Sequence, residues 1–174
     1  IAQKFNNDFK AEDFFPLPEP LIQKNISRVM SLRDGTKKMS KSEESDFSRI
    51  NLKDNADDII KKIKKAKTDT LPIPDNEADL KKRSEALNLL NIYGDLTNTS
   101  LTEVLKEMKG KEFSFFKKKL SDVVVEVVCP VGENMKKLMK EKSHLDAILQ
   151  KGKEKASNIA EENLKKIRSI VGLI

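Results

Sequence analysis

Two lysines three positions apart carry the clearest chemical signal in this chain. Lys38 and Lys41 belong to the run Lys-Lys-Met-Ser-Lys-Ser at residues 37–42, where Ser40 and Ser42 accompany them. Two ammonium groups at this spacing in a loop can face one polyphosphate. Their charge stabilises phosphoryl oxygens, while hydroxyl and backbone N–H groups add hydrogen bonds. Solvated loops of lysine and serine are also common, so the neighbouring residues decide between the two interpretations.

The residues before this loop favour a nucleotide site. Residues 28–32 alternate polar and apolar side chains, which predicts a short strand just before the loop. In open α/β sheets, ligands bind beyond the carboxyl ends of the strands. We therefore expect the loop to lie at the edge of such a sheet.

Composition and charge limit what else the chain can be. Its 174 residues are 36% charged, 37% hydrophobic and 5% aromatic, which suits helices around a modest core. The formal net charge of +6 favours a polyanionic partner such as tRNA, although a lysine-rich proteome produces the same excess. Cys129 is the only cysteine and His144 the only histidine, which excludes an internal disulfide and a zinc site. We expect a reducing cytoplasm, no metal ligands, and an inert Cys129.

No segment is predicted to enter a membrane. The longest apolar run, residues 123–131, is interrupted by Glu126 and is too short to cross a bilayer.

From about residue 54 the pattern is helical. Asp54 and Asn55 can cap a helix with an apolar stripe of Ile59, Ile60, Ile63 and Ala66. Its opposite face carries Lys61, Lys62, Lys64 and Lys65 and is expected to be solvated, with contact to phosphates as the alternative. Later helices are predicted at residues 79–93 with Gly94 as the stop, and at 100–108 with a Ser100–Glu103 capping box. Residues 123–128 have the composition of a strand, but a helix is predicted at 113–128 because apolar residues recur there at helical spacing: Phe116, Leu120, Val123, Val124 and Val127. Pro130 should kink or break the last of these, and a helix pair from Ser143, ending with residues 153–171, should close the chain.

The residues around the lysines carry a family resemblance. The run Arg-Val-Met-Ser-Leu-Arg-Asp-Gly-Thr-Lys-Lys-Met-Ser-Lys-Ser at 28–42 resembles a signature of class I aminoacyl-tRNA synthetases, and more narrowly of bacterial-type tryptophanyl-tRNA synthetases. Similar segments at 67–69, 88–93 and 123–130 extend the resemblance over nearly the whole chain. The family's first signature, of the His-Ile-Gly-His type, is absent. We therefore expect a C-terminal portion of such an enzyme, inactive alone.

The resemblance implies a mainly α fold in two parts. Residues 1–47 would be the C-terminal part of a Rossmann-type α/β catalytic domain, and residues 48–174 an all-α bundle that binds the tRNA anticodon, with a last helix able to pack back toward the catalytic half. The full-length protein would be a homodimer in the cytoplasm. A stand-alone helical RNA-binding or interaction module is the alternative; it has no reason to begin with half a Rossmann fold.

The resemblance also implies the chemistry, that of a tryptophan–tRNA ligase. ATP would activate L-tryptophan to the adenylate, and the acyl group would pass to tRNA(Trp), with the tryptophan pocket upstream of this chain. Lys38 and Lys41 would be catalytic, binding the departing pyrophosphate together with ATP-associated Mg²⁺. Val29 would contact the adenine through its backbone, and Met39 would help seat it. The implied ATP-binding residues are Val29, Lys38, Met39, Ser40, Lys41 and Ser42.

Overall fold

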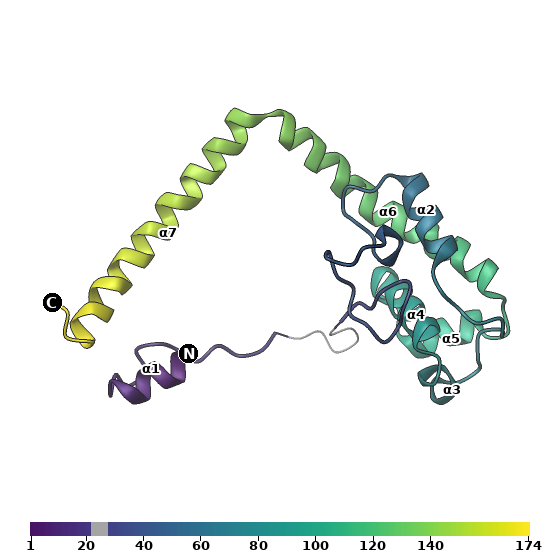
Figure 1. The fold of residues 1–174 in the computed structure, drawn as a ribbon, viewed down its shortest axis with the longest axis horizontal. Coiled ribbons are helices and arrows are strands. Elements are labelled where there is room, and N and C mark those ends of the chain that lie inside the picture. Colours follow the sequence, from purple (N-terminus) through teal and green to yellow (C-terminus); the bar gives the residue numbers. More distant parts are fainter. Residues whose placement is uncertain (22–27) are drawn as a thin grey trace. The chain divides into compact units, whose positions relative to one another are not determined.

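The computed structural model describes residues 1–21 and 28–174. Within these ranges the chain is mainly α, as expected: it forms seven α-helices and one 3-10 helix, and its β-structure is a single isolated bridge (Figure 1). The residues fall into two compact units, Gln23–Lys137 and the pair of segments Ile1–Ile22 and Leu138–Ile174. No helix among the described residues combines the length and the apolar character that crossing a bilayer requires.

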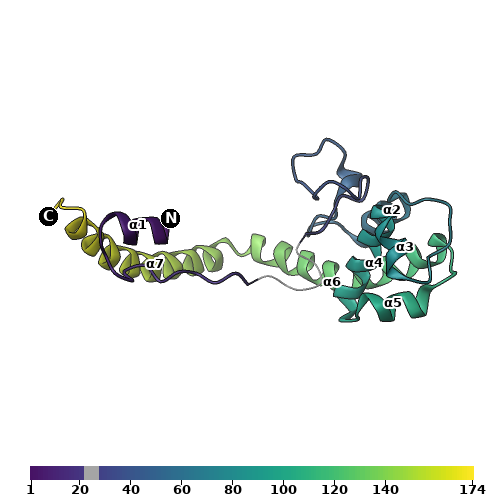
Figure 2. The ribbon, with the colours of Figure 1, turned by 90° about the horizontal axis from the view of Figure 1, so that it is seen from below.

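The larger unit is built around one apolar core. Its helices are α2 (Ala56–Lys65), α3 (Glu77–Lys81), α4 (Ser84–Thr97), α5 (Leu101–Met108) and most of α6 (Phe113–Lys140), which gather together in both views (Figures 1 and 2). Phe116 on α6 is fully buried, and its ring meets that of Tyr93 on α4 edge-on at 5.6 Å between centroids. Burying a side chain of this size contributes about 1.5–3 kcal/mol. The core's largest members are Ile59, Ile63, Leu80, Leu89, Leu90, Val104, Met108, Phe116 and Leu120.

Helix α2 follows its predicted stripe in part. Asn55 caps it by accepting a hydrogen bond from the backbone N–H of Asp58 at 2.9 Å, and Ile59 and Ile63 are buried. Ile60 was predicted on the same stripe but is 43% exposed. The prediction of a solvated lysine face is also wrong at one position, because Lys62 is buried.

Several predicted helix ends differ in the structure. The capping box of α5 is confirmed, with Ser100 and Glu103 each bonding the other's backbone. The helix predicted at 79–93 is instead the two helices α3 and α4, separated at Lys82 and Arg83. Gly94 does not end α4, which continues to Thr97 and stops at Asn98 in a left-handed conformation. A Cβ on Gly94 would lie 2.7 Å from the carbonyl oxygen of Thr99, so glycine is needed there for close approach.

The last two helices are longer than the sequence predicts. Helix α6 continues through Pro130 for 28 residues, and α7 (Lys142–Ile170) is a single helix of 29 residues rather than a pair. Gly152 costs a helix only about 1 kcal/mol relative to alanine, which does not interrupt one of this length. Helix α7 has no buried residue, so the prediction that it buries its apolar side chains is wrong within the described chain.

The first helix, α1 (Ala2–Asp8), carries a small aromatic cluster. The ring of Phe5 lies 4.9 Å from that of Phe9 and 5.0 Å from that of Phe15, between centroids. The Asn6 side chain donates to the carbonyl of Phe15 at 2.9 Å and accepts from its N–H at 3.1 Å. These contacts fold the residues after α1 back onto the helix.

Candidate functional site

Lys38 lies on a tight antiparallel hairpin, and Lys41 follows just after its second arm. Met30 pairs with Lys38 in the isolated bridge, and two backbone hydrogen bonds of 2.8 and 3.0 Å flank that pair. The strand predicted at residues 28–32 is therefore reduced to one bridge, and no described strand extends it into a sheet. Val29 is 40% exposed, and its carbonyl accepts a hydrogen bond from the N–H of Met39. The two residues that the family resemblance predicts to contact adenine are therefore paired across the hairpin.

A helix side chain takes the place of the missing neighbouring strand. Asn88 on α4 is buried, and its side-chain oxygen accepts the N–H of Met30 at 2.9 Å. Its amide nitrogen donates to the carbonyl of Met30, also at 2.9 Å. One side chain thus satisfies both main-chain groups of Met30, as a sheet would.

Leu32 attaches the hairpin to the helical core. Its side chain is 3% exposed within the core. Its N–H donates to the carbonyl of Ser48 at 2.8 Å, and its carbonyl accepts the N–H of Lys67, just after α2, at 2.8 Å. The hairpin is therefore continuous with the helices in this unit.

The turn of the hairpin is ordered by Asp34 and by a close backbone approach. The Asp34 carboxylate accepts from the N–H of Thr36 at 3.0 Å and from its hydroxyl at 2.6 Å, and these hydrogen bonds lower the pKa of Asp34. Gly35 lies against the start of α4: a Cβ there would come within 2.5 Å of backbone atoms of Ser84 and Glu85. Only glycine fits at position 35, because any Cβ would clash with the backbone at the start of α4.

The predicted phosphate-binding groups lie together after the turn. Ser40 and Ser42 share a hydrogen bond between their hydroxyl oxygens at 2.9 Å, and the N–H of Ser42 donates to Ser40 Oγ at 3.3 Å. Lys38 and Lys41 are exposed, and neither forms an ion pair with any residue that the structure describes. Met39 is half-buried against the core. The loop therefore presents two uncompensated ammonium groups and two hydroxyls to solvent.

Beneath the loop lies a chain of ion pairs that the sequence analysis missed. The Arg49 guanidinium contacts Asp46 at 3.0 Å, and Asp46 contacts the buried Lys62 ammonium at 2.6 Å. The hydrogen bond from Lys62 lowers the pKa of Asp46 to about 2. Burial opposes the charged form of Lys62, but hydrogen bonds to Asp46 and Asp54 outweigh it and raise the pKa of this lysine. Asp46 and Asp54 lie 16 and 8 positions before Lys62, and neither spacing predicts a contact. Only the fold shows that they meet.

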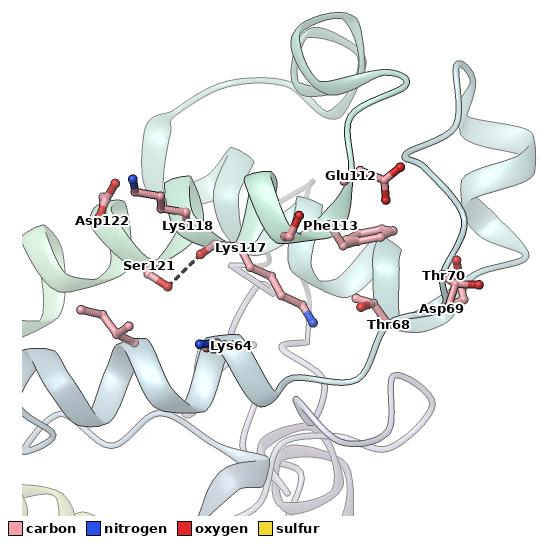
Figure 3. A pocket seen from close by; sticks show the side chains of 12 residues that line it. Lys64, Thr68, Asp69, Thr70, Glu112, Phe113, Lys117, Lys118, Ser121 and Asp122 are labelled. Atoms are coloured by element: carbon pink, nitrogen blue, oxygen red, sulfur yellow. Dashed lines mark hydrogen bonds between the residues drawn. The ribbon is translucent and has the colours of Figure 1, made fainter.

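A cleft of about 740 Å³ lies between α2 and the first half of α6. Lys64 of α2 and Lys117 of α6 face it from opposite walls, and Lys118 lines it further along α6 (Figure 3). The Lys117 ammonium donates to the carbonyl of Ala66 at 2.7 Å, at the end of α2, and burial lowers the pKa of Lys117. Lys117 therefore serves the fold, whereas Lys64 and Lys118 are exposed at the rim.

The polar side chains of the loop are hydrogen-bond donors, and no cluster of metal ligands accompanies them among the described residues. Among the described residues, no three His, Cys, Asp or Glu side chains gather in a way that could hold an ion. The loop supplies ammonium and hydroxyl groups, which suit phosphoryl oxygens.

Comparison with known proteins identifies the protein family of this chain and then its relatives within that family. Residues 1–129 match the family described as tRNA synthetases class I (W and Y). The chain belongs to this family. Within it, the chain is homologous to tryptophan–tRNA ligases: it is 52% identical over 172 residues to the one from Caulobacter vibrioides and 47% identical over 192 residues to the one from Rhizobium meliloti.

Solved structures agree with this assignment. The tryptophanyl-tRNA synthetase from Mycoplasma pneumoniae superposes on 98% of this chain with a TM-score of 0.78 at 26% identity, and the one from Campylobacter jejuni with a TM-score of 0.59 at 26% identity. The matches include 99% of this chain and 50% of the Caulobacter relative, 100% of this chain and 54% of the Rhizobium relative, and 98% of this chain and 52% of the Mycoplasma structure. It thus spans about half the length of the relatives that it matches.

Proposed function

We propose that this chain supplies the phosphate-binding loop and the tRNA-binding helices of a tryptophan–tRNA ligase. The observation that carries the proposal is the pair of exposed ammonium groups on Lys38 and Lys41, which form no ion pair with any described residue and lie on or just after a hairpin that the core anchors. The family match spans the loop and most of the helices together, which favours the ligase over a stand-alone RNA-binding module. The missing half of the relatives' length leaves room for the remainder of a Rossmann-type catalytic domain, of which residues 1–47 would be the end.

The proposed reaction begins with adenylate formation. A carboxylate oxygen of L-tryptophan attacks the α-phosphorus of ATP, the bond to the bridging oxygen breaks, and pyrophosphate leaves with that electron pair. Lys38 and Lys41 neutralise the growing charge on the leaving group, and Ser40 and Ser42 donate hydrogen bonds to it. ATP-associated Mg²⁺ would share this charge. The ribose hydroxyl at the 3′ end of tRNA(Trp) then attacks the carbonyl carbon of the adenylate and gives up its proton, the bond from that carbon to the phosphate oxygen breaks, and AMP leaves.

Kinetics of the full-length protein would test this role of the lysines. In tryptophan-dependent ATP–pyrophosphate exchange, Lys38→Ala and Lys41→Ala should each lower kcat by about 10²–10³-fold, as for one lost transition-state donor, while KM for tryptophan stays nearly constant. Lys37→Ala is the matched control, because its exposed ammonium already contacts Asp34 at 3.5 Å. Equal losses in all three variants, or losses confined to substrate binding, would refute the assignment. The isolated chain should show no exchange.

The helical region, residues 48–174, is proposed to bind tRNA(Trp), in a homodimeric and cytoplasmic enzyme. The exposed lysines at the α2–α6 cleft support this, because phosphate contacts require free ammonium groups. Lys64→Ala and Lys118→Ala should each weaken tRNA binding and reduce the slope of log affinity against log salt by about one. Lys117→Met is the control: its ammonium is held by Ala66, so the slope should not change. An unchanged slope in the first two variants would remove the cleft from the tRNA interface.

A further inference from the structure

The backbone of the loop has little support of its own. Among the described residues, no backbone–backbone hydrogen bond of good geometry involves residues 40–44, where Lys41 and Ser42 form a turn. Within the loop, only the serine side chains bond one another and the N–H of Ser42. A segment held this weakly, with neighbouring lysines that repel, does not fix its own conformation. The position of Lys41 must therefore depend on groups outside the loop.

Arg49 supplies the missing hydrogen bonds. Its Nη1 donates to the carbonyl of Glu43 at 2.8 Å and more weakly to that of Ser40 at 3.5 Å, so one nitrogen reaches both sides of Lys41. Its Nη2 lies 3.0 Å from the Asp46 carboxylate, and the side chain is only 16% exposed. The guanidinium thus faces the loop backbone and a carboxylate instead of solvent.

The Arg49 side chain is itself anchored in α2. Asp46 binds Lys62 at 2.6 Å, and Lys62 binds Asp54 at 2.5 Å. The Lys62 and Asp54 side chains are 5% and 9% exposed. Two cations, Arg49 and Lys62, meet two carboxylates, so this chain of ion pairs carries no net charge. It adds rigidity under the loop and no attraction for phosphate.

We propose that Arg49, anchored through Asp46 and Lys62 to helix α2, is a positioning residue that fixes the backbone around Lys41 for adenylate formation. The inference rests on the proposed function. Arg49 acts through Lys41 and does not touch the nucleotide, because its Nη1 and Nη2 already contact the loop carbonyls and Asp46. Lysine cannot replace it, since a single ammonium does not span two loop carbonyls and a carboxylate as a planar fork does.

A double-mutant cycle in the full-length protein tests this. Arg49→Gln should lower kcat of ATP–pyrophosphate exchange by about 10²-fold, the cost of misplacing a catalytic group by about 1 Å, with KM for tryptophan unchanged. In a Lys41→Ala background the same change should cost at most about threefold, because the residue that it positions is already gone. Arg168→Gln, on exposed α7, is the matched control and should have no effect.

Trypsin provides a readout that does not depend on activity. Arg49→Gln should accelerate cleavage after Lys41, while circular dichroism shows the helices intact. Asp46→Asn is a milder second variant, because the Asp46 side chain is 54% exposed, and it should give the same pattern with a smaller loss.

The outcomes separate the two proposals. A wild-type protein without exchange activity refutes the proposed function. The trypsin experiment would still show whether Arg49 holds the loop backbone in place. An active wild type whose Arg49→Gln variant keeps both its kcat and its resistance to trypsin overturns the positioning role. Equal losses with and without Lys41 also overturn it, because Arg49 would then act on the nucleotide itself.

Discussion

The paired hydrogen bonds between Asn88 and Met30 allow a local test of how the hairpin is held. In Asn88→Leu the side chain keeps a similar volume but neither accepts from the N–H of Met30 nor donates to its carbonyl. Both bonds are 2.9 Å long in a part-buried site. The hairpin should then open more often, although the helices remain folded.

The size of the effect follows from the two main-chain groups left without partners. Each buried polar group that loses its partner costs about 1–3 kcal/mol. Because Met30 is only half-buried, the cost for its N–H and for its carbonyl should each lie toward the lower end of this range. The expected loss is about 2–4 kcal/mol for the pair, which is about 30-fold to several hundred-fold in the equilibrium for opening.

Amide hydrogen exchange in residues 29–39 measures this opening directly. Asn88→Leu should accelerate exchange there by the stated factor and leave α5 unchanged. Asn91→Leu, on the same helix, is the control: Asn91 is half-exposed, and its side chain makes no hydrogen bond with any described residue. An acceleration below about threefold, or an equal one in the control, would show that Asn88 does not hold the hairpin.

Three further changes test neighbouring contacts. Gly35→Ala forces a Cβ to within 2.5 Å of the backbone of Ser84 and Glu85; it should destabilise the chain by about 1–3 kcal/mol in urea unfolding, whereas Gly152→Ala, in open space, should not destabilise it. Ser48 Oγ is buried without a partner among the described residues, so Ser48→Ala should raise stability by up to about 1 kcal/mol; a loss of similar size would reveal an unseen partner. Folding lowers the pKa of Asp46 from 3.8 to about 2, so its stabilisation is complete above pH 4 and disappears as the pH falls toward 2; NMR titration of the carboxyl should show this, and Asp46→Asn should lose that part of the acid dependence.

Local patterns predicted the local structure well. The Ser100–Glu103 box and the Asn55 cap each satisfy backbone groups within three residues, and both are confirmed. The helix at 113–128, chosen over a strand because Phe116, Leu120 and Val124 recur on one face, is also confirmed. In these cases the partners that decide the structure lie within one or two turns of each other.

Two of the failures involve partners that are distant in sequence. Residues 28–32 have the alternation of a strand, but their neighbour is the side chain of Asn88, 58 positions away from Met30, so one bridge forms and no sheet among the described residues. Lys62 belongs to a lysine-rich run, yet Asp46 and Asp54 fold over it and bury it. The spacing of these residues in the sequence predicts neither the Asn88–Met30 contact nor the burial of Lys62. The division into domains at residues 47 and 48 stays a prediction, although the hairpin and the helices share one compact unit.

Burial and pairing, more than the number of cations, decide what each lysine or arginine near the loop can do. Arg49 and Lys62 are mostly buried, and carboxylates compensate their charge, so they stabilise the backbone and add no field for a phosphate. Lys38 and Lys41 are exposed and uncompensated among the described residues, so both ammonium groups stay available to the proposed polyphosphate. The net charge of +6 over the whole chain does not show which cations stabilise the backbone and which are available to a phosphate. If the loop had instead folded with its lysines paired to Asp46 and Asp54, the sequence motif would be unchanged and the phosphate site would be lost.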